Sequence, residues 1–453
     1  MTLGASLHGS WIGAGHSQLP HGVQDRFLAE AARRRQAEAT LRECFARWSY
    51  QEVIPPTLEY YENLIVGASA ALQQAMYRLL DHEGHMLALR ADFTPQVARM
   101  AATKLFDQPM PLRCFYVGNL FRHEEPQAGR QSEFTQAGIE LIGADTPAAD
   151  AEVVALAIAA LEALKLRDFQ VNLGQMAFFR ALTGDLPAGT LDPIREAIDQ
   201  KNSARLVDTL DQTGVSGDQR ELLRRLPDLI GGPEVLGQAR ALSAGLAGAA
   251  EAGAAIERLA QVHRLLQAYG VADQVILDLG EVRGMDYYTG ITFRGVAPGL
   301  GWPITSGGRY DDLIVHFGRS LAAVGFGLGI ERALLVQTSH GSPSPSLAPH
   351  VLVCGCDHPG CLALIARLRQ RGSRVEIDVL GLDETKLAEQ AHQRGIPRTL
   401  RCLGDITRSD LRPEPGSRGR HKVWRLTDER GERALTDAAL LKEAEKWSQK
   451  GGT

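Results

Sequence analysis

Residues 113–140 read RCFYVGNLFRHEEPQAGRQSEFTQAGIE, in which two apolar runs enclose a polar, charged segment. The runs at 113–121 and 134–142 have the length and alternation typical of strands, so the stretch predicts a hairpin with a polar loop. Side chains two residues apart lie on one face of a strand, which lets the Gln136 amide and the Glu140 carboxylate converge on one small ligand. A solvated hairpin with surface charges explains these residues equally well.

Two arginines, Arg122 and Arg130, stand at the mouth of this hairpin. Their guanidinium groups are planar donors that suit phosphate or carboxylate. The Glu140 carboxylate instead suits a ligand ammonium or imidazole group. The hairpin therefore offers contacts for a cationic and for an anionic group.

Outward from the hairpin, the apolar spacing predicts the remaining elements of a sheet. Strands are expected at 86–89, 275–279, 287–296 and 322–328, and helices at 24–50, 150–164 and 310–317. A turn is expected at Ser306-Gly307-Gly308. Residues 175–270 are almost entirely helical in pattern, which indicates a helical insert in a sheet that the second half of the chain completes.

The composition is that of an ordinary globular protein. Of the 453 residues, 44% are hydrophobic and 23% are charged, which excludes a disordered or collagen-like chain. The formal charge of -5 gives no general affinity for nucleic acid or anionic membranes. No apolar run reaches the roughly 18 residues of a membrane span, and the cysteines are too sparse for a secreted disulfide framework, so we expect a cytoplasmic protein.

Four parts are expected along the chain. They are a flexible tail at 1–17, a core at 18–340, a Pro/Ser linker at 341–349 and a separate module at 350–453. The module opens with a strand, a helix and a strand, which predicts a small α/β domain. It contains 19 Lys and Arg against 15 Asp and Glu, so it carries a charge of +4.

Four potential metal ligands, Cys354, Cys356, His358 and Cys361, lie within eight residues of the module. This composition could bind zinc. However, a close-packed turn between a strand and a helix explains the same residues without a metal. We therefore assign neither a metal nor a cofactor from the sequence.

The hairpin resembles motif 2 of the class II aminoacyl-tRNA synthetases, in the form found in histidyl-tRNA synthetases. Residues 282–289, VRGMDYYT, are similar to the histidine-specific signature of those enzymes. Residues 307–311 and 323–332 resemble their motif 3, and the segments at 19–25 and up to Pro56 resemble their entry segment and motif 1. The resemblance covers about residues 19–335. It implies an α+β fold with an antiparallel sheet of six or seven strands, followed by an α/β module of the anticodon-binding type.

The same resemblance implies roles for individual residues. A histidine pocket would be lined by Asp92, Thr94, Gln136, Glu140, Arg283, Tyr287 and Tyr288. Arg122, Arg130 and Arg332 would face the nucleotide phosphates. In a synthetase Arg283 would be the catalytic arginine, which acts electrostatically on the transferred group.

One segment departs from the synthetase pattern. Where synthetases have Leu-Arg-Pro-Glu-Gly-Thr, residues 89–99 read LRADFTPQVAR. Asp92 sets the carboxylate back by one methylene and Phe93 fills the space beside it, so the positioning of an amino acid for catalysis should suffer. The string is similar to the signature of the synthetase-like regulatory subunits of ATP phosphoribosyltransferase, as are residues 53–60, 226–231 and the helices at 182–210.

This second resemblance implies a protein of histidine biosynthesis without catalytic residues of its own. It would be the regulatory partner of the short-form catalytic subunit, with a homodimer core in a hetero-oligomer, and histidine would bind it as an allosteric ligand. Neither a membrane nor tRNA is an expected partner.

The alternative is an active histidyl-tRNA synthetase. Many regulatory subunits end after the motif 3 helix, whereas this chain continues for about 100 residues as a basic module that would suit RNA phosphates. A solvated basic face explains the same charge.

Overall fold

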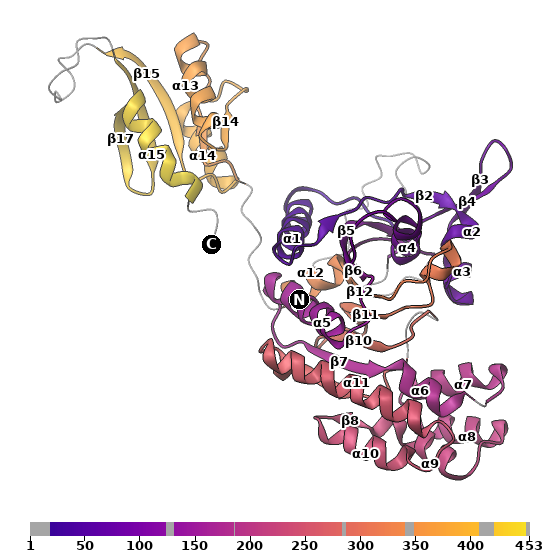
Figure 1. Cartoon of the computed structure of the whole chain (residues 1–453). Helices are drawn as coiled ribbons and strands as arrows, with labels where there is room; N and C mark the ends of the chain where they lie inside the picture. Colours follow the sequence, from indigo (N-terminus) through magenta and orange to yellow (C-terminus); the bar gives the residue numbers. More distant parts are fainter. Residues whose placement is uncertain are drawn as a thin grey trace. The chain divides into compact units, whose positions relative to one another are not determined.

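The computed structural model of the chain describes residues 19–123, 131–184, 186–282, 287–339, 348–406 and 421–449. The expected tail at 1–17 and most of the expected linker lie outside these residues. The chain divides into two compact units, residues 1–26 with 33–343 and residues 27–32 with 344–453. Figure 1 labels most of the helices and strands of both units.

A mixed sheet of nine strands forms the centre of the larger unit. Its strands are, in spatial order, β1 (Gln51–Glu52), β5 (Leu112–Phe121), β6 (Glu133–Ile142), β12 (Ala323–Gly329), β11 (Thr305–Arg309), β10 (Ile291–Val296), β7 (Gln170–Gln175), β9 (Val275–Asp278) and β8 (Ile230–Gly231). The six strands from β5 to β7 pair antiparallel throughout. The predicted antiparallel centre is thus present, and three short strands, β1, β9 and β8, extend it to nine, with β1 and β9 in parallel pairing. Of these three the sequence predicted only β9, at 275–279, and it also did not reveal β7.

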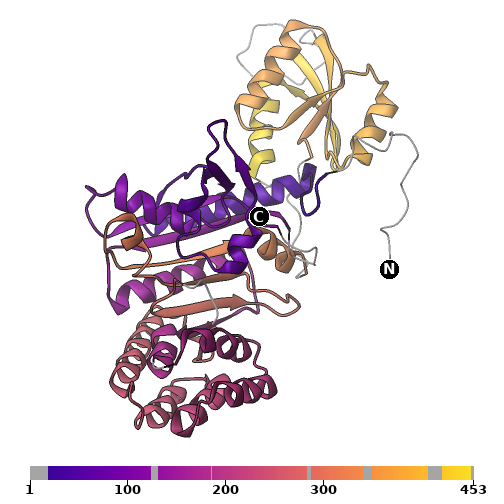
Figure 2. The ribbon, with the colours of Figure 1, turned by 90° about the vertical axis from the view of Figure 1, so that its right-hand side faces the viewer.

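Helices cover the two faces of this sheet, as the side view of Figure 2 shows. The odd-numbered residues Ala137, Ile139 and Leu141 of β6 belong to one core, together with most of helix α5 (Pro147–Ala163). A second core contains Cys114 and Tyr116 of β5 with helix α4 (Thr94–Thr103). Because side chains of a strand alternate between faces, the even-numbered residues of β6 face α4.

Three further helices of the larger unit flank the sheet or follow it. They are α1 (Leu28–Arg47), α12 (Ile330–Ser339) and the short 3-10 helix η3 (Ile314–Phe317). A separate three-stranded sheet, in the order β2 (Leu58–Tyr60), β4 (Met86–Leu89) and β3 (Arg78–Leu80), lies beside the short helices α2 (Tyr61–Leu64) and α3 (Ala70–Ala75). The strand predicted at 86–89 is therefore present, but it belongs to this second sheet.

The insert between β7 and β9 is helical, as predicted. It contains α6 (Met176–Thr183), α7 (Ala188–Asp199), α8 (Ser203–Thr213), α9 (Gly217–Arg225), η1 (Leu226–Asp228), α10 (Glu234–Ser243), α11 (Ala249–Ala268) and η2 (Ala272–Gln274). Helix α11 packs on α5, α6 and β7. The insert is thus joined to the sheet through its longest helix (Figure 1).

The smaller unit is an α/β module with a five-stranded sheet. The sheet has the order β14 (Val375–Ile377), β13 (Val351–Val353), β15 (Thr399–Ile406), β16 (His421–Asp428) and β17 (Gly431–Thr436), with helices α13 (Pro359–Gln370), α14 (Glu384–Gln393) and α15 (Asp437–Gln449). Strands β13 and β14 run parallel and are joined through α13, which confirms the predicted strand-helix-strand opening. The module has a hydrophobic core of its own around Trp424.

Two local predictions are wrong. Ser306-Gly307-Gly308, predicted as a turn, lies inside strand β11, and the expected helix at 310–317 is reduced to η3. The glycines are required by packing, because a Cβ at Gly307 would meet the Phe293 ring and one at Gly308 the Tyr288 ring. A glycine pair that usually signals a turn allows, in this protein, two aromatic rings to lie against a strand.

Candidate functional site

The Glu140 side chain lies on the α4 side of the sheet and is 1% exposed. The Thr94 hydroxyl donates to its Oε1 at 2.8 Å, and the Tyr116 hydroxyl lies 3.4 Å from the same oxygen. The Tyr310 hydroxyl donates to Oε2. Burial raises the pKa of Glu140 to about 8, although these hydrogen bonds oppose the rise. Its carboxyl group is therefore enclosed by hydroxyl donors from three separate segments.

Asp92 provides a second buried carboxylate next to Glu140. The Tyr287 hydroxyl donates to Asp92 Oδ2 at 3.1 Å, and the backbone N–H of Thr94 donates to Oδ1 at 3.4 Å. Burial raises the pKa of Asp92, whereas the charge of Arg122 lowers it. The Asp92 charge in turn adds to the raised pKa of Glu140. Burial and the neighbouring carboxylate both make ionisation of these groups unfavourable. A ligand with a cationic group would stabilise their charged forms.

The neighbouring strand β12 makes room for these side chains. Gly325 pairs with Glu140 across the β6–β12 ladder, and a Cβ at Gly325 would collide with the Glu140 carboxylate. A Cβ at Gly327 would collide in the same way with the amide of Gln136. The glycines of this strand thus permit the Glu140 and Gln136 side chains to pack closely against it.

Gln136 lies on the same face of β6 as Glu140. Its Oε1 is buried, and no donor within the described parts of the chain lies in hydrogen-bonding reach of it. Buried polar atoms in proteins are almost always hydrogen-bonded. An N–H group of a bound ligand would satisfy this acceptor.

Phe93 fills the position at which the synthetases have glycine. Its ring is 1% exposed and stacks on Tyr116 with centroids 4.2 Å apart. The Arg90 guanidinium lies 4.4 Å from the centroid of the Phe93 ring, and Arg90 also donates to the carbonyl of Pro55 at 2.8 Å. Phe93 is therefore a fixed wall beside the carboxylates, as the sequence predicted for a phenylalanine in this place.

The arginines expected at the phosphate end contact backbone carbonyls. Arg122 Nε donates to the carbonyl of Ala91 at 2.8 Å, and its guanidinium lies over the Phe134 ring. Arg332 Nη1 donates to the carbonyl of Pro303 at 2.9 Å. The other two predicted arginines, Arg130 and Arg283, lie outside the described residues.

The structure thus brings together most of the side chains that were predicted for the pocket. Asp92, Thr94, Glu140 and Tyr287 form one hydrogen-bonded cluster, and the Tyr288 ring lies 5.2 Å from that of Tyr287. Sequence reasoning missed the donors Tyr116 and Tyr310. Strand alternation could have identified Tyr116, because it lies opposite Gly138 on the same face as Glu140.

A family model and several known proteins are similar in sequence to this chain. The model of the histidyl-tRNA synthetase family matches residues 22–333. The chain is 41% identical to the ATP phosphoribosyltransferase regulatory subunit of Moorella thermoacetica, over 86% of this chain and 98% of that protein. It is 39% identical to the regulatory subunit of Symbiobacterium thermophilum, over 85% and 96% of the two chains.

Two solved structures of similar proteins superpose on this chain. A protein of Bacillus halodurans described as an ATP phosphoribosyltransferase regulatory subunit/histidyl-tRNA synthetase superposes with a TM-score of 0.73 at 31% identity, over 83% of this chain and 96% of its own. The histidyl-tRNA synthetase of a Nostoc species superposes with a TM-score of 0.76 at 22% identity, over 95% and 99% of the two chains, and so shares the fold.

The length of these matches corrects one expectation. An alignment over 391 residues with the Moorella protein cannot fit into residues 1–349, so it extends into the C-terminal module. The continuation after the motif 3 helix therefore does not distinguish this chain from regulatory subunits. Among the described residues, none of the helices has the length and apolar character needed to cross a membrane.

Proposed function

The chain belongs to the histidyl-tRNA synthetase family, among its ATP phosphoribosyltransferase regulatory subunits, and from this premise we propose that it regulates the first step of histidine biosynthesis. It does so without catalysing the transfer, as the partner of a short-form catalytic subunit. Histidine is the ligand that it senses. The observation that carries this proposal is the buried pair Asp92 and Glu140, which forms an acidic pocket suited to an amino acid with a basic side chain.

The pocket supports histidine as the ligand through its donors and acceptors. Glu140 is placed to accept from an imidazole or an ammonium group, and Gln136 Oε1 offers a further acceptor. Thr94 and Tyr287 hold the two carboxylates in position. We include Tyr288 and Arg283 among the histidine contacts, and Arg122, Arg130 and Arg332 as contacts for an anionic group.

Feedback control requires that histidine bind two states of the assembly with unequal affinity, because a ligand with equal affinity for both shifts neither. We propose that these states are states of a complex between this chain and the catalytic subunit. The complex is built on a homodimer of this chain, because two-fold interfaces are the commonest in oligomers.

Exposed apolar side chains in the region of motif 1 support the homodimer. Leu58 and Tyr60 of β2 and Leu79 of β3 are exposed, and their pairing with Leu89 and Leu87 of β4 places all three on one face of the three-stranded sheet. Contiguous exposed apolar side chains mark interaction surfaces in proteins. We propose that a second copy of the chain covers this surface of the three-stranded sheet.

The cytoplasm is the proposed location. None of the six cysteines, all of which lie in the described residues, forms a disulfide, which suits a reducing compartment.

Reconstitution with the catalytic subunit tests the function. Mixed with its cognate short-form subunit, the chain should raise the rate of phosphoribosyl transfer to ATP and make that rate sensitive to histidine. Neither component alone should do both. A monomer by light scattering that leaves the catalytic subunit unchanged would contradict the proposal.

Aminoacylation provides the opposite test. Histidine-dependent pyrophosphate exchange and charging of histidine tRNA should both be absent, because Phe93 and Asp92 replace the synthetase residues beside the amino acid. Robust charging would establish a synthetase instead. Exchange without charging would mean that adenylate formation persists in a protein that does not act on tRNA.

The C-terminal module is proposed to be dispensable for activation. The pocket residues all precede residue 340, and the module has its own core. A chain that ends before residue 349 should therefore activate the catalytic subunit to within about twofold of the full chain, a difference of about 0.4 kcal/mol.

A further inference from the structure

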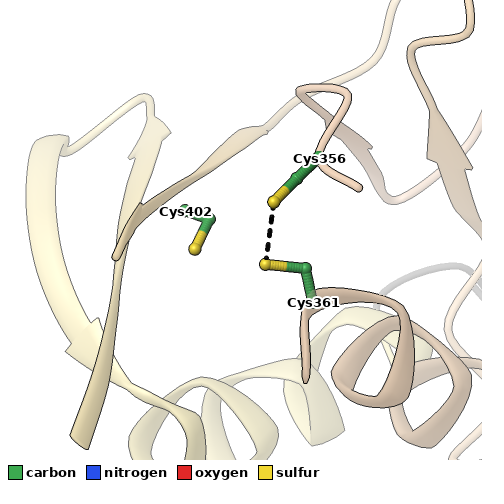
Figure 3. A group of neighbouring side chains, drawn as sticks. All are labelled: Cys356, Cys361 and Cys402. Carbon is green, nitrogen blue, oxygen red and sulfur yellow. Dashed lines mark hydrogen bonds between the residues drawn. The ribbon is translucent and has the colours of Figure 1, made fainter. Parts of the chain in front are cut away.

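Three cysteines of the C-terminal module converge on one point. Cys356 lies in the loop after β13, Cys361 is the third residue of α13, and Cys402 lies on β15. Their sulfur atoms are all within 4.8 Å of one another, and those of Cys356 and Cys361 are 3.1 Å apart. Figure 3 shows Cys356 and Cys361 pointing toward each other, with Cys402 beside them.

The sequence alone could not reveal this group. Cys354, Cys356, His358 and Cys361 are close in the chain, but Cys402 follows only after two further elements of secondary structure. Parallel pairing of β13 with β15 brings Cys402 to the start of α13. The structure therefore replaces a local run of potential ligands by a different set that spans three elements.

Exposure and charge also suit a bound ion. Cys361 is fully buried, whereas Cys356 and Cys402 are partly exposed, so an ion from solvent can reach the group from one side. A bound cation would deprotonate the coordinating thiols and offset the repulsion between the resulting thiolates.

We propose that Cys356, Cys361 and Cys402 form a binding site for one thiophilic divalent cation, with zinc as the fitting ion. Thiolate sulfur lies about 2.3 Å from zinc, so two sulfurs of a tetrahedral site are roughly 3.8 Å apart. The separations of the three sulfurs, from 3.1 Å to at most 4.8 Å, bracket this value. Small rotations of the side chains would bring the sulfurs to the required distance, and a water molecule or another donor would complete the coordination.

Such an ion would cross-link three segments of the module. It would link the loop after β13, the first turn of α13 and strand β15. Each thiol that binds gives its proton to solvent and becomes a thiolate ligand. Because the ion binds the folded arrangement, it would stabilise the module in proportion to its affinity and concentration.

Metal titration of the full-length chain tests the site. The chain is reduced, stripped of metal with a chelator and titrated with zinc against a coloured competing chelator, and cobalt serves as the spectroscopic probe. We expect one ion per chain and the sulfur-to-metal absorption of a cobalt thiolate site. Cys402→Ser should weaken zinc binding by about a hundredfold or more, since even residues that only orient metal ligands contribute ten- to a hundredfold.

Cys44→Ser is the matched control, because Cys44 is a partly buried free cysteine on α1, outside the three-cysteine group. It should leave zinc affinity unchanged. If circular dichroism shows that Cys402→Ser does not fold, Cys356→Ser, at a partly exposed position, replaces it in the test. Zinc affinity that is equal in wild type and the ligand variant would overturn the proposal, as would a disulfide between Cys356 and Cys361 in a chain that binds no zinc.

Discussion

The proposed pocket has an acidic end, formed by Asp92 and Glu140, and a basic end, formed by Arg122 and Arg332. These two ends hold their charged groups in different ways. At the acidic end, hydroxyl groups of Thr94, Tyr287 and Tyr310 donate to the Asp92 and Glu140 carboxylates, so side chains from distant segments depend on one another. At the basic end, Arg122 and Arg332 donate to backbone carbonyls. The hydrogen bonds of the acidic end thus run between side chains, whereas those of the two arginines go to backbone carbonyls, and Arg122 also lies over the Phe134 ring. Substitutions should therefore affect ligand binding more strongly at the acidic end.

Truncation of Phe93, which packs beside the carboxylates of the acidic end, should give the largest effect, a loss of unfolding free energy. Phe93→Ala removes a fully buried ring that stacks on Tyr116, and such truncations cost about 3 to 5 kcal/mol because they leave a cavity. Urea unfolding of the larger unit measures the loss. Phe106→Ala is the control, since that ring is 58% exposed and should change the unfolding free energy by about 0.5 kcal/mol or less. Equal losses in the two variants would show that Phe93 is not a structural wall.

The second effect concerns the ligand itself. Glu140→Ala should weaken histidine binding by roughly ten- to a hundredfold, because a hydrogen bond to a charged group contributes about 1.5 to 3 kcal/mol. Isothermal titration calorimetry measures this change. Glu133→Ala is the matched control: it lies on the same strand, on the opposite face, and its carboxylate accepts from Asn119. Unchanged affinity in Glu140→Ala would refute the assignment of the pocket.

The raised pKa of Glu140 also predicts a pH-dependent effect on stability. Burial raises this pKa from 4.5 in the unfolded chain to about 8 in the folded protein. The protonated group therefore contributes stability that is fully present below about pH 4.5 and is lost as the pH rises through about 8. The slope reaches at most about 1.4 kcal/mol per pH unit.

Unfolding of the histidine-free protein at a series of pH values measures this slope. Glu140→Gln has no titrating group at this position, so its unfolding free energy should depend less on pH in the same interval. Parallel curves for the two proteins would mean that Glu140 titrates in its ordinary range.

Much of this site could be predicted because its signals are local. Strand alternation at 113–142 places Gln136 and Glu140 on one face, and the departure at Asp92 and Phe93 is visible in a single string. Both predictions depend on residues close together in the chain. The periodicity of a strand is enough to orient them.

What the sequence did not reveal depends on contacts between distant segments. Tyr310 reaches Glu140 only because β11, β12 and β6 pair in one register. The sequence predicts a turn at Gly307, since no local signal shows that the Phe293 ring lies against it. Cys402 joins the other cysteines through the pairing of β13 with β15. In each case strand pairing, which a single sequence does not specify, creates the contact.

The smallest effect is expected at the basic end and sharpens the contrast between the two ends. Arg332→Ala removes a donor to the Pro303 carbonyl, but in the described structure that contact is made to backbone and not to the acidic cluster. We therefore expect the affinity for histidine alone to stay within about twofold, a change of about 0.4 kcal/mol, in the calorimetric experiment used for Glu140→Ala. Thermal unfolding of the variant serves as the check that it folds. A loss as large as that of Glu140→Ala would mean that the arginine holds the histidine carboxylate directly, and the division of the pocket into an amino-acid end and an anion end would then be wrong.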